Sequence, residues 1–115
     1  MLPQKYRLTS PTDFSRATKS GVRVGSGNFF LYLYQSSDDL PPRAGLIISK
    51  AVGGSVIRHK VARRLRHEIS HHIPTLTPGT LVVVRALAHA KNADVSQEIP
   101  TLLKKAQNKS AMVAR

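Results

Sequence analysis

Residues 56–72 read Val56-Ile57-Arg58-His59-Lys60-Val61-Ala62-Arg63-Arg64-Leu65-Arg66-His67-Glu68-Ile69-Ser70-His71-His72. At about 100° per residue, four apolar side chains and one histidine of this stretch fall on a single stripe roughly 100° wide. The stripe consists of Val61, Ala62, Leu65, Ile69 and His72. This spacing predicts a long helix, from about Val56 to His72, that packs one side against a core.

The opposite arc of the predicted helix is strongly cationic. It carries Lys60, Arg63, Arg64, Arg66, His67 and His71, while Arg58 falls on the apolar stripe at the first turn, where it can reach past the edge of a sheet. Five Lys and Arg within nine residues face one acid, so i,i+4 pairing cannot neutralise this face. Arg predominates, and its planar guanidinium suits phosphate. We therefore predict that RNA or DNA phosphates bind to Arg58, His59, Lys60, Arg63, Arg64 and Arg66; the alternative is a solvated amphipathic helix.

A glycine pair precedes the helix. Gly53-Gly54-Ser55 offers backbone N–H groups at the positive end of the helix dipole, and Lys50 lies in the loop just before. These residues predict a further anion-binding site, although a plain turn explains the two glycines equally well.

One stretch of the helix matches a zinc-protease motif. His67-Glu68-Ile69-Ser70-His71 fits H-E-x-x-H, in which the two histidines would bind zinc and Glu68 would act as general base. His72 points about 100° away from His71, and the surrounding cations oppose a bound dication. We therefore predict no metal site in the protein and interpret the histidines as solvated side chains, favourable at a helix C-terminus.

The whole chain is small and basic. Its 115 residues suit one domain, and 18 Lys and Arg against 6 Asp and Glu leave a net charge of +12, which indicates a polyanionic partner. The absence of cysteine excludes a disulfide scaffold and a thiol nucleophile and agrees with a cytoplasmic location. No apolar run suggests a secretory signal or a membrane span, so no membrane partner is expected.

The remaining pattern predicts a single mixed α/β (α+β) domain spanning residues 1–115. Residues 1–8 are expected to form an extended basic arm, and residues 108–115 a disordered tail. Ser10 is expected to cap a short helix to about Lys19. Four strands are expected near 22–24, 29–34, 44–49 and 80–85, and a C-terminal helix is expected to begin at or just before Pro100.

Three aromatic side chains are candidate base-stacking residues. Phe30 and Tyr32 are two residues apart on a predicted strand and so share a face, and Phe14 lies on the first helix. Aromatic rings bind single-stranded nucleic acid with little sequence preference. Ordinary core packing is the equally weighted alternative.

The block Lys50–Arg66 resembles the arginine-rich motif of the bacterial ribonuclease P protein family. Direct matches are Ser49, Lys50, Gly53, Val56, Arg58, Arg63 and Arg66, with Lys60 keeping the charge of an Arg. Asp13-Phe14, Gly21, Phe29–Tyr34 and Ala44-Gly45-Leu46 also fall where the family pattern has them, and the resemblance spans roughly residues 6–106. The departures are Ala51, His59, Ala62, Arg64 and Thr18, the last where many relatives have a second aromatic.

The resemblance implies both a fold and a role. The fold would be a four-stranded sheet with a left-handed βαβ crossover, as in the second domain of a small-subunit ribosomal protein. The role would be the protein subunit of an endonuclease whose catalytic RNA uses Mg²⁺ to remove the 5′ leader of precursor tRNA. One protein monomer would bind each RNA, the leader would lie in a cleft with Phe14, Phe30 and Tyr32, and no protein residue would be catalytic.

Two other functions remain open from the residues alone. A non-catalytic basic RNA-binding protein, of ribosomal or RNA-chaperone type, fits the charge as well as the ribonuclease role does. A free-standing zinc hydrolase would require the H-E-x-x-H stretch, which the cationic helix disfavours. Only the family resemblance separates the ribonuclease role from the non-catalytic RNA-binding role.

Overall fold

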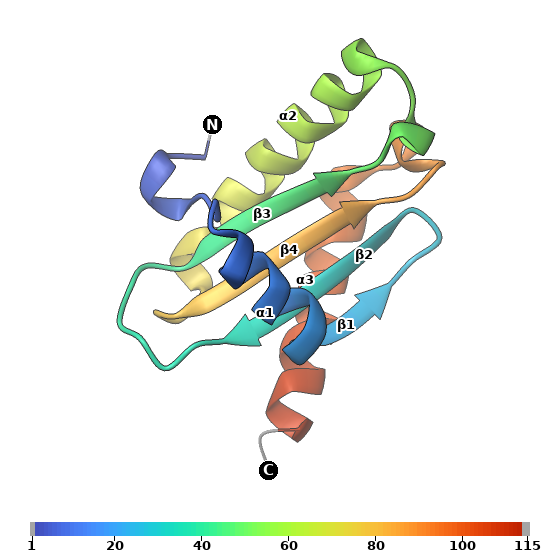
Figure 1. The fold of residues 1–115 in the computed structure, drawn as a ribbon. Coiled ribbons are helices and arrows are strands. Elements are labelled where there is room, and N and C mark those ends of the chain that lie inside the picture. The colour runs from blue at the N-terminus through green and yellow to red at the C-terminus, as the bar shows by residue number, and fades with distance from the viewer. Residues whose placement is uncertain (1, 114–115) are drawn as a thin grey trace.

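Three helices and a four-stranded sheet make up residues 2–113, the part of the chain that the computed structural model describes. The elements are α1 (Pro11–Ser20), β1 (Val22–Gly25), β2 (Phe29–Gln35), β3 (Arg43–Ile48), α2 (Ser55–His72), β4 (Thr80–Ala86) and α3 (Val95–Val113) (Figure 1). Three short 3₁₀ turns lie between them, at Lys50–Val52, Ile73–Thr75 and Ala90–Asn92, and a fourth, at Gln4–Tyr6, precedes α1. Each strand, α1 and α2 lie within two residues of the ranges predicted from the sequence.

The strand order is β1-β2-β4-β3, so the last strand enters the middle of the sheet. β2 is antiparallel to β1 and β4, whereas β3 and β4 are parallel and are joined through α2. With β3 and β4 pointing up, β4 lies to the right of β3 and α2 crosses behind the sheet (Figure 1). This crossover is left-handed, as the family resemblance implied and against the usual preference for right-handed connections.

The two faces of the sheet are covered differently. On one face Phe29, Leu31 and Leu33 of β2 join a large core with α2 and α3. On the other face Tyr32 forms a smaller cluster with Ala17 of α1, together with Leu81 and Val83 of β4. Because the alternating residues of β2 are apolar on both sides, the strand is buried between two layers.

The N-terminal segment is not the free extended arm that the sequence predicts. Leu2 and Leu8 are buried in the two hydrophobic clusters, and the segment turns through a 3₁₀ turn at Gln4–Tyr6. Arg7 pairs with Ala44 in a parallel bridge, and the Leu8 N–H donates to the Ala44 carbonyl at 2.9 Å. Two leucines without local periodicity anchor the segment to the edge of β3.

The C-terminal helix also differs from the prediction. α3 begins at Val95, five residues before Pro100, and continues to Val113. An internal proline costs about 3 kcal/mol or more, but burial of Val95 and Ile99 in the core favours the early start. Residues 108–113 are therefore helical and not a disordered tail, while 114 and 115 lie outside the described residues.

Within residues 2–113, no helix combines the length and the apolar character needed to cross a membrane.

Candidate nucleic-acid interface

The cations of α2 point away from the core, as predicted. Val61, Ala62, Leu65 and Ile69 are buried beneath the helix. On the other side His59, Lys60, Arg63 and Arg64 are exposed, and Arg58 and Arg66 are half-buried. Because the apolar stripe fixes the rotation of the helix, it also fixes the direction in which the cations project.

A hollow of about 690 Å³ lies over this cationic face. It is lined by His59, Arg63, Arg64, Arg66, His67 and residues 93–96 at the start of α3. Arg64 Nη2 donates to the Lys91 carbonyl at 3.0 Å, which ties its guanidinium to the wall near α3. Asp94 is the one acid in the lining, so the hollow is suited to an anionic ligand.

Arg58 occupies a special position at the first turn of α2. Its side chain is half-buried, and its Nε is buried with no hydrogen-bond partner within the described part of the chain. A buried N–H without an acceptor costs free energy, and a phosphate oxygen is one acceptor that would satisfy it.

The loop before α2 has the features expected of an anion-binding site. Gly54 is the N-cap and no side chain caps the helix, so the first N–H groups have no side-chain acceptor. Gly53 adopts φ 151°, a conformation that side-chain-bearing residues rarely adopt, and a Cβ there would also crowd Ile57. Gly54, Ser55 and Lys50 are exposed beside it.

The three candidate stacking residues meet on the α1 side of the sheet but differ in access. Tyr32 is only 7% exposed beneath α1, so its ring cannot serve as a stacking surface, and its assignment to an open cleft is wrong. Phe14 and Phe30 are half-buried at the margin of the same cluster. The guanidinium of Arg23 lies 4.8 Å from the ring centroid of Phe30.

Phe14 packs closely against the sheet. A Cβ at position 45 would collide with the Phe14 ring, so Gly45 allows α1 to approach β3. Phe14 also lines a cavity of about 240 Å³ with Leu8, Leu46 and Arg66, among others. This cavity brings an aromatic residue of α1 and a cation of α2 to the same edge of β3.

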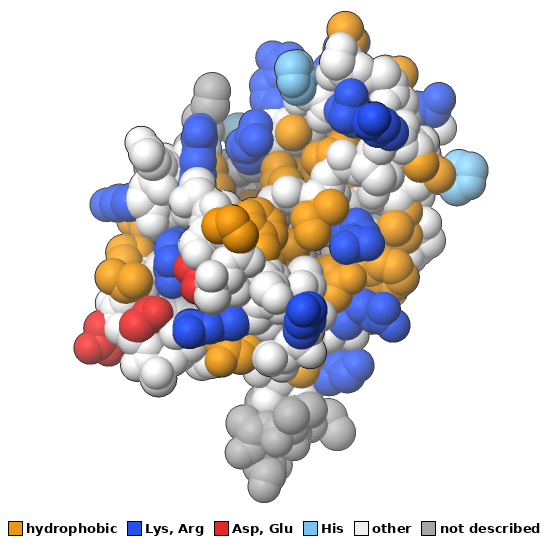
Figure 2. All heavy atoms as spheres, viewed as in Figure 1, with side chains coloured by type: hydrophobic (Ala, Val, Ile, Leu, Met, Phe, Trp, Pro, Cys, Tyr) orange, Lys and Arg blue, Asp and Glu red, His pale blue; other side chains and the backbone are white. Residues whose placement is uncertain are grey.

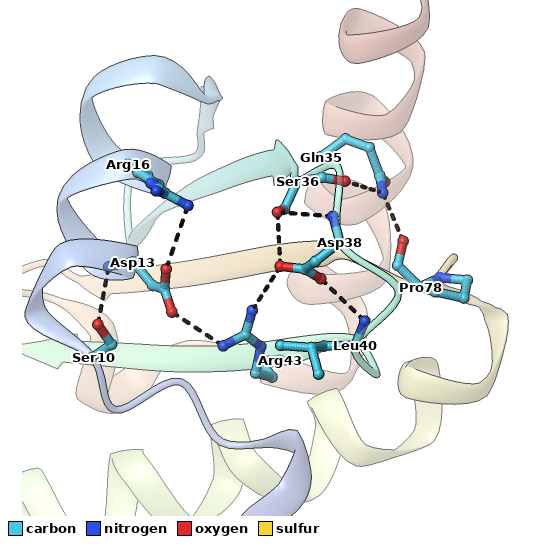
Figure 3. Close-up of polar contacts among 9 residues, drawn as sticks. All are labelled: Ser10, Asp13, Arg16, Gln35, Ser36, Asp38, Leu40, Arg43 and Pro78. Carbon is cyan, nitrogen blue, oxygen red and sulfur yellow. Dashed lines mark hydrogen bonds and ion pairs between the residues drawn. The ribbon is translucent and has the colours of Figure 1, made fainter.

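The charge distribution on the α1-bearing face is uneven. Figure 2 shows Lys and Arg spread over this face with hydrophobic side chains between them, whereas acidic side chains gather at one edge, over the loop between β2 and β3. At that edge Arg43 contacts both Asp13, at 3.0 Å, and Asp38, at 3.6 Å (Figure 3). Two of the few acids are thus paired with a cation.

Comparisons with known proteins agree on one family. The family model described as Ribonuclease P matches residues 2–107. The chain belongs to the ribonuclease P protein family. The ribonuclease P protein component of Mycobacterium sp. (strain KMS) is 40% identical over 111 residues, covering 93% of this chain and 94% of that protein. That of Streptomyces avermitilis is 44% identical over 105 residues, covering 84% and 85%.

Solved structures of the family share the fold. The ribonuclease P protein of Staphylococcus aureus superimposes with a TM-score of 0.79 at 26% identity, over 89% of this chain and 95% of that one. The Thermotoga maritima protein, at 20% identity, gives a TM-score of 0.70 over 89% and 96%. As a ribonuclease P protein, the chain is the protein subunit of a tRNA-processing endonuclease, which implies an RNA partner.

Two residues of this ribonuclease P protein were not recognised as site candidates from the sequence. Arg85 pairs with Phe30 across the sheet, and Ile47 pairs with Arg85, so all three share the α1-side face. Arg85 is exposed, in a strand whose other side chains are buried. A single charge within the apolar run Leu81–Ala86 was the available signal, but only the strand order places it beside Phe30.

The H-E-x-x-H stretch is not arranged as a protease site. Glu68 Oε2 lies 2.8 Å from His72 Nε2, so the carboxylate is paired away from His67 and His71. No cluster of three or more metal-ligating His, Asp or Glu side chains occurs within residues 2–113.

Proposed function

We propose that this ribonuclease P protein binds the catalytic RNA through α2 and the 5′ leader of precursor tRNA through the α1-side face of the sheet. The observation that carries the first half is the basic hollow over α2. Three arginines and two histidines face one acid there, without internal neutralisation. The cations at Arg58 and Lys60 and the uncapped start of the helix extend this surface along the chain.

The leader surface rests on Phe14 and Phe30, with Arg23 and Arg85 beside Phe30. A row of paired residues, Gly25-Phe30-Arg85-Ile47, crosses the sheet on this face. Its aromatic ring and flanking guanidinium groups provide the stacking and phosphate contacts that bind single strands without reading sequence. Leaders that differ in sequence would therefore be accepted.

The chemistry belongs to the RNA in this proposal. Mg²⁺ would be held mainly by RNA phosphates, and the protein would lower the Mg²⁺ concentration required, because its cations replace part of the counterion charge around the RNA. One protein would serve each RNA, in the bacterial cytoplasm.

Reconstitution tests the proposal directly. The untagged protein, a bacterial ribonuclease P RNA, precursor tRNA and Mg²⁺ are combined, with each component omitted in turn. We expect the protein alone to leave precursor tRNA intact, and the complex to cut at the 5′ end at lower Mg²⁺ than the RNA alone. Cleavage by RNA-free protein would refute the assignment of chemistry to the RNA. An unchanged Mg²⁺ requirement would contradict the proposal that the protein's cations replace part of the counterion charge around the RNA.

A further inference from the structure

The two histidines of the H-E-x-x-H stretch have no metal-binding role in the RNA processing proposed above, although His67 lines the basic hollow over α2. His67 and His71 lie one turn apart on α2, both exposed, and their rings are nearly perpendicular, at 86°, with centroids 4.8 Å apart. Their Nε2 atoms are 3.4 Å apart. The two Nε2 atoms are thus within hydrogen-bonding range of each other and lie over the same region of the helix surface.

This separation matches the bite of a tetrahedral metal ion. Zn²⁺ binds imidazole nitrogen at about 2.0–2.1 Å, and a tetrahedron with such bonds has edges of about 3.3–3.4 Å. Mg²⁺ does not fit, because it prefers oxygen ligands and its octahedral edges are shorter, about 2.9 Å for bonds of about 2.0–2.1 Å. The spacing and the nitrogen donors both select a borderline transition ion.

The neighbouring acid does not complete a catalytic centre. Glu68 is paired with His72, and its side chain is only 14% exposed. The hollow beside His67 contributes Arg63, Arg64 and Arg66, which repel a dication. Water would fill the remaining coordination positions in the free protein.

We propose that His67 and His71 form a two-histidine binding site for Zn²⁺, or for Co²⁺ in its place, on the exposed face of α2, at variance with the absence of a metal site predicted from the sequence. This binding site is separate from the Mg²⁺ of the RNA reaction and has no hydrolytic role, because Glu68 is held by His72. It does not depend on the RNA contacts proposed above.

The test uses the untagged full chain, stripped with a chelator and titrated with Zn²⁺ against a chromophoric competitor. We expect one Zn²⁺ per chain. His67→Gln and His71→Gln should each weaken binding by at least about 10-fold, since loss of even an outer-shell partner of a metal ligand costs 10–100-fold. Circular dichroism checks that the helices persist, as expected for substitutions at exposed positions.

Three matched controls separate the two-histidine site from nonspecific or alternative binding. His89→Gln removes an exposed histidine outside α2, and His72→Gln and Glu68→Gln remove the adjacent pair. All three should bind Zn²⁺ as the wild type does. Equal loss in His89→Gln, greater loss in His72→Gln than in His71→Gln, or a wild-type dissociation constant above about 1 mM would each overturn the proposal.

Ionic strength provides a second, independent signature. Because the neighbouring arginines repel the ion, screening by an inert salt should tighten Zn²⁺ binding. A site built on carboxylates would instead bind Zn²⁺ more weakly as the salt concentration rises. Co²⁺ bound in the two-histidine site should show the visible absorption of a tetrahedral complex, absent from His67→Gln. Weaker binding at high salt, or a Co²⁺ spectrum unchanged by His67→Gln, would contradict the proposed ligands.

Discussion

Arg43 Nη1 of β3 lies 3.0 Å from Asp13 Oδ2 of α1, which joins the first helix to an edge strand thirty residues later in the chain. Nη2 of the same guanidinium lies 3.6 Å from Asp38 Oδ2 in the loop between β2 and β3 (Figure 3). The side chains of Arg43 and Asp13 are 18% and 17% exposed, so the pair is largely shielded from water. This contact holds α1, which carries Phe14, over the face of the sheet that carries Phe30.

Removing Arg43 should therefore loosen α1. Arg43→Ala removes the cation that Asp13 and Asp38 share and leaves Asp13 with Arg16 Nη1 at 3.9 Å. We expect a loss of about 1–3 kcal/mol in the free energy of unfolding, measured by urea denaturation. Arg43→Lys keeps the charge but not the two-sided guanidinium contact and should recover part of the loss. Lys104→Ala, an exposed cation on α3, is the control and should change stability by less than about 0.5 kcal/mol. Equal stability of Arg43→Ala and the control would show that the pair contributes nothing.

Asp38 should make a small contribution to acid stability. The hydroxyl of Ser36 lowers the pKa of Asp38 below its ordinary value of 3.8, and the Leu40 N–H and the charges of Arg43 and Arg16 act in the same direction. A lowered folded-state pKa means that the stabilisation is present above the unfolded-state pKa and is lost as the pH falls through the folded-state pKa. Ser36→Ala should raise the pKa of Asp38, as followed by NMR titration of its carboxyl carbon. An unchanged titration would rule out the hydroxyl as the main cause.

The α2 cations should act through phosphates. Each phosphate contact contributes about −0.7 to −0.9 to the slope of log K against log salt. Arg63→Ala should weaken binding of ribonuclease P RNA and make the slope shallower by up to about one unit. Lys104→Ala again serves as the control, since it removes an exposed cation from another helix. If both variants shift the slope equally, the binding follows net charge and not the α2 surface.

The two half-buried aromatic residues should separate precursor from mature tRNA. Phe30→Ala removes a ring worth about 1–3 kcal/mol per stacked base, so the reconstituted enzyme should bind precursor tRNA more weakly and mature tRNA unchanged. Binding of both RNAs is measured across a salt series, in which the slope should stay nearly constant. Equal weakening for the two RNAs would remove Phe30 from the leader surface.

Tyr32 should behave as a core residue instead. Tyr32→Ala is expected to cost about 3–5 kcal/mol of stability, as large-to-small changes of buried aromatic residues do. Tyr32→Phe keeps the buried ring and should retain both stability and leader binding. Selective loss of precursor binding in a stably folded Tyr32→Phe variant would contradict its burial beneath α1.

The sequence was sufficient to predict a helix or strand wherever the residues that define the element lie within the element itself. The apolar stripe of α2 determined the helix from Ser55 to His72 and the outward direction of its cations, because helical periodicity places side chains by angle alone. Ser10 and Pro11 marked the start of α1, and the Ser10 hydroxyl does accept a hydrogen bond from the Asp13 N–H. The family followed from the motif around Arg58, Arg63 and Arg66.

Only the tertiary structure decided the properties that depend on partners distant in the chain. Leu2 and Leu8 are buried, and α3 starts before Pro100, because side chains elsewhere cover them. Tyr32 and Phe30 share a strand face, yet α1 covers Tyr32 and leaves Phe30 half-exposed next to Arg85. Sequence periodicity fixes the face of a strand on which a side chain lies, but the packing of remote segments fixes whether that face meets water, and this distinction separates core residues from candidate binding residues in this protein.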